Sequence, residues 1–303
     1  MNLVQKLENS WELMKTSLRV IRDHPRLALF PIVTTLSVLV IAAFFIVPLV
    51  LLAIGQASAL AWLESHGWQV PAGADRFREA FGWLYYSCGA VIYLLSLLLG
   101  TFCNVAFYHE ILRALAGQPV SVRSGFSFAR SRIGSILMWS LLAGTVGLII
   151  RAIEERLGWL GKIVMGLIGT AWSVAAVFAI PVIVRHEERN PFAVLRASAL
   201  TLKQTWGESL VGFLGVQALG LVVLFASLAF ALTEVILIVA LHRVWLGVAL
   251  AVLFVLALVL YGFVLSLATH VYRCALYVFA SEGVVPQPYS REMMDAGWKI
   301  RKA

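Results

Sequence analysis

The sequence predicts an all-α integral membrane protein whose six transmembrane helices form three hairpins. Three observations support this prediction: long apolar stretches, a low content of charged residues, and basic residues concentrated in alternate connections. The chain is 61% hydrophobic and 13% charged, whereas soluble domains carry about 25% charged residues. Its mean hydropathy of +0.88 is too high for a soluble protein of this size.

Six apolar stretches are each near or above the ~17–25 residues with which an α-helix crosses a bilayer. They cover about residues 27–54, 83–108, 134–150, 163–184, 209–232 and 244–272. Each is continuous and lacks the alternation of an outer-membrane barrel strand. The first stretch is also far longer than the apolar core of a signal peptide, so we expect an uncleaved anchor.

The basic residues predict the orientation of these helices. Of the 24 Lys and Arg residues, 18 lie at the two chain ends and in the connections after the second and fourth spans. Short loops rich in Lys and Arg stay on the cytoplasmic side of a membrane. We therefore expect both termini to be cytoplasmic.

A basic amphipathic helix is predicted before each hairpin. Apolar residues recur at spacings of four and three over about residues 7–21, 122–133 and 195–206. The polar faces of these segments carry Arg19, Arg22, Arg123, Arg130, Arg196 and Lys203. Such helices lie in the headgroup plane, so we expect these six residues to bind anionic lipid headgroups.

The three hairpins also suggest an internal repeat. Each even-numbered span is followed by an acidic residue, namely Glu110, Glu187 and Glu282, and then by a proline. We interpret residues 1–282 as one membrane domain of three units, about 1–110, 111–187 and 188–282, in a pseudo-threefold parallel repeat. Alternatively, any series of hairpins with basic inner loops would show this pattern. Residues 283–303 are expected to form a cytoplasmic amphipathic tail.

Polar side chains within the spans are scarce. Asn104, His270 and Arg273 are the candidates for lining a cytoplasm-facing polar cavity, because polar groups at depth must face protein or water. His270 and Arg273 are three residues apart and share a helix face. Alternatively, Arg273 extends its side chain to the headgroups.

No catalytic or metal-binding motif is present in the sequence. His109-Glu110 resembles the start of a zinc-protease motif, but Arg113 occupies the position of the second histidine. Cys88, Cys103 and Cys274 show no metal or redox spacing. We expect no enzyme activity, no metal and no cofactor. The net charge of +8 flanks membrane segments, which favours anionic lipid over nucleic acid as a partner.

One segment carries a family resemblance. Asn190-Pro191-Phe192, Arg196-Ala197-Ser198 and the stretch from Lys203 to Glu208 follow Pro181, and Ser10-Trp11, His24-Pro25 and Phe30-Pro31 lie upstream. Together they resemble an uncharacterised family of prokaryotic polytopic membrane proteins, classed as a domain of unknown function. The resemblance implies six spans in a prokaryotic inner membrane and implies no established activity.

Two functions remain open from the sequence. The favoured one is a channel or transporter for an ion or small solute, working through the polar cavity and assembling with further copies of itself, because Asn104 and Arg273 are costly to leave facing lipid. The second is a non-catalytic membrane organiser or scaffold, which binds anionic lipid or a protein partner through its basic helices.

Overall fold

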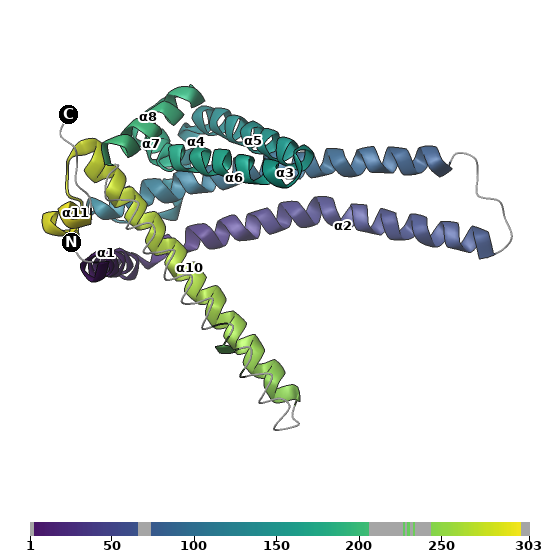
Figure 1. Ribbon diagram of the computed structural model, residues 1–303, viewed down its shortest axis with the longest axis horizontal. Coiled ribbons are helices and arrows are strands. Elements are labelled where there is room, and N and C mark those ends of the chain that lie inside the picture. The colour runs from purple at the N-terminus through teal and green to yellow at the C-terminus, as the bar shows by residue number, and fades with distance from the viewer. Residues whose placement is uncertain are drawn as a thin grey trace.

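The computed structural model describes residues 3–65, 74–205, 227, 229–230, 233 and 244–297. Within these residues the chain is helical and contains no strand (Figure 1). The elements are α1 (Leu3–Asp23), the 3-10 helix η1 (Pro25–Ala28), α2 (Leu29–Ser65), α3 (Ala74–Leu115), α4 (Val122–Ser131), α5 (Ile133–Arg156), α6 (Gly158–Ala175), α7 (Ala179–Arg185), α8 (Pro191–Thr205), α10 (Val244–Glu282) and α11 (Arg291–Gly297).

Five helical segments are long and apolar enough to cross a membrane. They are Pro25–Leu51, Gly82–Leu115, Ile133–Arg156, Gly161–Arg185 and Gly247–Glu282. These segments coincide with five of the six predicted spans. The predicted span at 209–232 lies outside the described residues except for 227, 229 and 230.

Three of the helices are much longer than a bilayer requires. α2, α3 and α10 contain 37, 42 and 39 residues, which at 1.5 Å per residue gives roughly 55–65 Å. The sequence predicted a connection over 55–82, whereas α2 continues to Ser65 and α3 begins at Ala74. Residues 56–65 are rich in alanine and leucine, which favour the helix, and this composition extends α2 beyond the apolar stretch.

The hydrophobic core lies at one end of the molecule. It joins α1, η1 and the start of α5 to the last turns of α3 and α10, with α4, α7, α8 and α11 packed around them. We call this region the packed end, and both α1 and α11 lie there (Figure 1). Phe30 illustrates the packing, since its ring centroid is 5.6 Å from those of both Phe107 and Phe126.

Away from the packed end the long helices separate. Figure 1 shows α10 running at a steep angle to the α2–α3 pair. Among the 18 most apolar consecutive residues of α10, none is buried. In the corresponding stretch of α2, only 6% of the residues are buried. The apolar side chains of these helices therefore face outward, as the side chains of helices that contact lipid do.

The predicted amphipathic segments form helices α1, α4 and α8, and each buries one side against the spans. The buried positions are Leu13, Met14, Thr16, Ser17 and Val20 of α1, Gly125 and Ala129 of α4, and Val194, Ser198 and Thr201 of α8. α1 contacts α10 and α11, α4 contacts α3, and α8 contacts α7 and α10. The headgroup-plane prediction did not include this packing against protein.

Small residues permit the close approach of α4 to α3. A Cβ atom on Gly125 would lie 2.9 Å from the Ala106 carbonyl oxygen and 3.0 Å from Cγ of Glu110. Such distances are too short for a real side chain, so glycine is required at this crossing.

The fourth predicted span is a broken helix. α6 ends at Ala175 and α7 begins at Ala179, with Pro181 in the first turn of α7, where a missing N–H is tolerated. The break leaves backbone groups without partners inside the helix ladder. The Ser198 hydroxyl of α8 bonds two of them: it donates to the Ala175 carbonyl at 2.6 Å and accepts from the Phe178 N–H at 3.0 Å.

Candidate functional site

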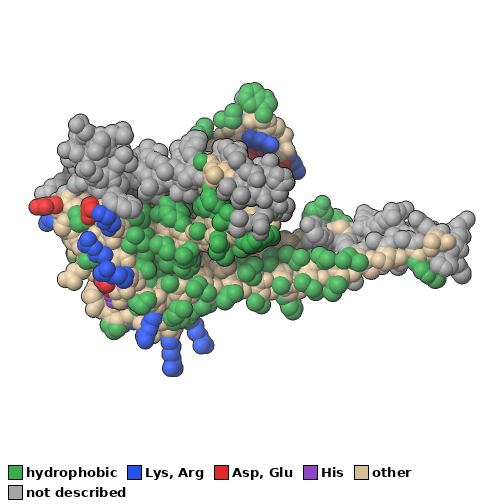
Figure 2. All heavy atoms as spheres, turned by 90° about the horizontal axis from the view of Figure 1, so that it is seen from below, with side chains coloured by type: hydrophobic (Ala, Val, Ile, Leu, Met, Phe, Trp, Pro, Cys, Tyr) green, Lys and Arg blue, Asp and Glu red, His purple; other side chains and the backbone are tan. Residues whose placement is uncertain are grey.

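Six basic residues form a candidate lipid-binding surface at the packed end. They are Arg19, Arg22, Arg123, Arg130, Arg196 and Lys203, two each from α1, α4 and α8, and all six are exposed. We call this set the basic rim. On the face seen in Figure 2, Lys and Arg side chains lie in the half that holds the packed end, next to a long hydrophobic surface, and a smaller basic group lies on the protrusion at the top.

The acidic residues that follow the even-numbered spans bond mainly to arginines outside the rim. Arg185 pairs with Glu282 through two contacts, Nε to Oε1 at 2.9 Å and Nη2 to Oε2 at 3.3 Å. Arg132 pairs with Glu187 at 3.2 Å. Within the rim, Arg22 lies 3.6 Å from the exposed Asp23 carboxylate, and such an exposed pair is weak.

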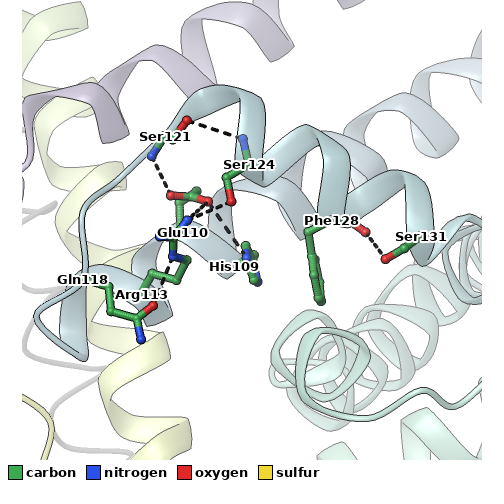
Figure 3. A network of polar contacts seen from close by, with 8 residues as sticks. All are labelled: His109, Glu110, Arg113, Gln118, Ser121, Ser124, Phe128 and Ser131. Atoms are coloured by element: carbon green, nitrogen blue, oxygen red, sulfur yellow. Dashed lines mark hydrogen bonds and ion pairs between the residues drawn. The ribbon is translucent and has the colours of Figure 1, made fainter.

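Glu110 is fully buried and fixes the turn between α3 and α4 (Figure 3). Its Oε2 accepts from the Ser121 backbone N–H at 2.7 Å, and its Oε1 lies 3.4 Å from Nη1 of Arg113. The same Arg113 nitrogen donates to the Ser124 hydroxyl at 2.8 Å. Because Ser121 is the N-cap of α4, this network sets the start of α4 and thereby the direction of its basic face.

A second set of contacts holds the far end of α4. The His109 ring stacks on Phe128 at a centroid distance of 3.9 Å and an interplanar angle of 7°. The Arg132 guanidinium lies over the same ring at 5.4 Å, within cation–π range. Since Arg132 also pairs with Glu187, α4 is linked to the connection after α7.

The residues predicted to line a cavity lie along the seam between α3 and α10. Nη1 of Arg273 donates to the buried Tyr108 hydroxyl at 3.3 Å. The His270 ring packs against Phe107 and Tyr108 at 5.5 and 5.6 Å. Asn104 is half-buried on α3, one helical turn before Tyr108. We call the contact of Tyr108, His270 and Arg273 the polar seam.

A groove of 640 Å³ lies elsewhere, between α2, α3 and α5, and none of Asn104, His270 and Arg273 lines it. The contacts of the polar seam join α3 to α10, and Tyr108 is buried between them. Among the residues the structure describes, no three His, Cys, Asp or Glu side chains are grouped in a way that could hold a metal ion. The expectation of no metal and no enzyme activity stays a prediction.

Sequence reasoning missed three polar contacts at the packed end. Ser198 bridges the α6–α7 break, Tyr108 bonds Arg273, and the Ser17 hydroxyl lies 2.7 Å from the Tyr289 hydroxyl. Ser17 and Ser198 lie in mid-helix, where serine is common on exposed faces. Only their burial, which depends on tertiary packing, distinguishes them.

Long apolar helices with a packed, basic end define the class: an all-helical protein of membrane-spanning architecture. A sequence model described as a family of unknown function, DUF6159, matches residues 84–286, so the chain belongs to this family. The predicted resemblance to an uncharacterised domain family is confirmed, although its upstream residues, such as Trp11 and His24, lie outside the match. A search of curated proteins and a search of solved structures each found no match.

Proposed function

We propose that the protein is a non-catalytic membrane organiser that binds anionic lipid through the basic rim, with the packed end at the cytoplasmic surface. The family has no known function, so the proposal depends on the geometry of this chain. One observation carries it: each of three short helices buries one side against the spans and exposes its basic side.

Rigid placement distinguishes the rim from a set of flexible basic loops. α4 is held by the Glu110 network at one end and by the Phe128 contacts at the other. α8 is held by Ser198 at the helix break, and α1 by the contact between Ser17 and Tyr289. Basic groups near an anionic membrane surface contribute about 1 kcal/mol each, and helices that are already ordered lose little entropy on binding.

Neutralising one helix of the rim tests this proposal. We expect the variant with Arg123→Gln and Arg130→Gln to lose selectivity for a spin-labelled phosphatidylglycerol over phosphatidylcholine, by about 2 kcal/mol in summed association free energy. The measurement is the motionally restricted fraction of each labelled lipid around the reconstituted full chain. Both side chains are exposed, so the fold should be unaffected.

The matched control is the variant with Arg156→Gln and Lys162→Gln. It removes two exposed basic residues at the end of the α5–α6 hairpin away from the packed end, where Glu154 and Glu155 already offset the positive charge. Its lipid selectivity should equal that of the wild type. Equal selectivity in the wild type, the rim variant and the control would contradict the proposal.

Permeation is the second candidate function, and the depth of Arg273 within α10 favours it. Arg273 lies nine residues before Glu282, about 13 Å deeper along α10. A charged group at such depth is costly, and in membrane proteins it often marks an ion or substrate pathway. The organiser proposal expects ion and small-solute flux in liposomes with wild-type protein to equal that of empty liposomes. Flux above that level that is lost in Arg273→Leu would support permeation and contradict the organiser proposal.

A further inference from the structure

The groove between α2, α3 and α5 has the volume of a ligand site and is open along one side. Its volume of 640 Å³ lies within the range of about 300–1,000 Å³ that is usual for small-molecule pockets. Small residues make the space: Gly89 and Ala90 come from α3, and Gly147 comes from α5. A Cβ atom built on Gly89 would meet no atom within 4 Å, so the groove is open at that point.

The chemistry of the groove changes along α5. Arg151 and Glu155 line one end, and Leu148 and Gly147 lie about one turn closer to the packed end. Arg151 is 17 residues from Gly134, about 26 Å along the helix, which approaches the ~30 Å thickness of a hydrocarbon core.

Two exposed tryptophans indicate independently that the charged end of the groove lies near the membrane–water interface. Trp83 and Trp159, at the ends of their spans away from the packed end, are each 71% exposed. Tryptophan is enriched at the membrane–water interface. The charged end of the groove therefore lies at headgroup level, and its apolar end lies at the depth of acyl chains, in the leaflet farther from the packed end.

The charged end carries groups of both signs. Nε of Arg151 donates to Oε1 of Glu155 at 3.1 Å, and their side chains are 78% and 66% exposed. This bond uses one of the five N–H donors of a guanidinium group and one of two carboxylate oxygens. A phosphate suits the guanidinium, and a primary ammonium group suits the carboxylate.

We infer that this groove binds one glycerophospholipid with an ethanolamine headgroup, drawn from the leaflet farther from the packed end. The phosphate bonds Arg151, the ammonium group donates to Glu155, and one acyl chain follows the groove past Gly89. A phosphatidylglycerol has no cation for Glu155, and a phosphatidylcholine has no N–H donor. The site is separate from the basic rim.

Photocrosslinking tests the location of this lipid. The full chain is reconstituted in phosphatidylcholine nanodiscs that contain a minor fraction of phosphatidylethanolamine with a diazirine in its acyl chain. After irradiation, labelled peptides are quantified by mass spectrometry, and wild-type labelling should concentrate within 86–93 and 147–155. Gly89→Leu should lower this labelling about tenfold, the equivalent of 1.4 kcal/mol, because leucine fills open space in the groove.

The matched control is Gly100→Leu on the same helix. A Cβ atom there also meets no atom within 4 Å, but Gly100 does not line the groove, so labelling should remain at the wild-type level. Equal labelling of the groove peptides in wild type, Gly89→Leu and Gly100→Leu would overturn the inference and would show only annular lipid contact.

Competition by unlabelled lipid tests the headgroup. Phosphatidylethanolamine should compete better than phosphatidylcholine or phosphatidylglycerol in the wild type. Glu155→Gln should abolish this preference, and Arg151→Gln should lower labelling about tenfold, the loss expected for one charge-assisted hydrogen bond. Equal competition by all three lipids in the wild type would overturn the ethanolamine assignment.

Discussion

At the scale of single residues, buried polar groups hold the packed end together by bonding backbone that has lost its regular partners. Ser198 bonds the carbonyl and N–H groups that the α6–α7 break releases. Glu110 bonds the N–H of Ser121 at the start of α4. Without such partners, buried backbone groups would destabilise the fold.

Replacing Ser198 tests this role. We expect Ser198→Ala to lower the free energy of unfolding in detergent by about 1–3 kcal/mol, because it leaves a buried N–H and a buried carbonyl unpaired. Denaturant titration measures the change, and Ser131→Ala is the control because that hydroxyl is exposed and bonds only the Phe128 carbonyl of its own helix. If the two variants are equally stable, Ser198 does not support the break.

At the scale of elements, apolar periodicity predicted the amphipathic helices correctly because burial of one face drives them to form. It did not predict which residues of α8 are buried. The apolar residues spaced by four and three in the predicted segment are Leu195, Ala199, Leu202 and Trp206, of which Trp206 lies outside the described residues. The other three are half-buried, whereas Val194, Ser198 and Thr201 are buried. A shift of one residue moves the contact face by about 100°, and the neighbouring elements determine it.

The candidate site was predictable only in part, for a similar reason. The rim residues are exposed, as a basic polar face predicts. The partner of Arg273, by contrast, is Tyr108 from a helix more than 160 positions away, and no local pattern indicates such a pairing. The sequence also does not indicate that α10 diverges from α2 and α3. In a soluble protein the apolar face of a helix identifies the side that packs on protein, whereas a helix in lipid is apolar on all sides and shows no such face.

The segment after α10 packs on α1 as a structural element. Tyr289 and Met294 are buried, and the Tyr289 hydroxyl meets that of Ser17 at 2.7 Å. Burial raises the pKa of the Tyr289 phenol above its usual value. The docked segment therefore keeps its proton at a pH at which an undocked tyrosine, with a pKa of about 10, has lost it.

This shift predicts a pH dependence of docking. The stabilisation of the docked segment by the protonated Tyr289 phenol is complete below about pH 10. It is lost as the pH rises toward the pKa of Tyr289 in the docked state, because only the undocked phenol ionises in that range. We expect the distribution of distances between spin labels at Glu12→Cys and Arg291→Cys, in a chain with Cys88→Ala, to broaden above about pH 10. In Tyr289→Phe the broadening with pH should be absent, and an unchanged broadening would contradict the assignment.

At the scale of the whole molecule, one packed end holds helices that separate along the rest of their length. The described core involves η1 and the neighbouring turns of α2, the last turns of α3 and α10, and the short helices around them. The long apolar surfaces beyond this core have lipid as their natural contact. The rim lies at the packed end and the groove lies near the other end of α5, midway along α2 and α3, so the two proposals assign opposite leaflets to two lipid sites.

The sidedness of the packed end tests this account most directly. One cysteine at a time, at Glu12 on α1 or at Lys162 on α6, both exposed, is introduced into a chain with Cys88→Ala, in which the remaining Cys103 and Cys274 are buried. The cells are treated intact with a membrane-impermeant thiol reagent. We predict that Lys162→Cys reacts in intact cells and that Glu12→Cys reacts only after permeabilisation. Reaction of Glu12→Cys in intact cells, with protection of Lys162→Cys, would place the basic rim outside and contradict the account.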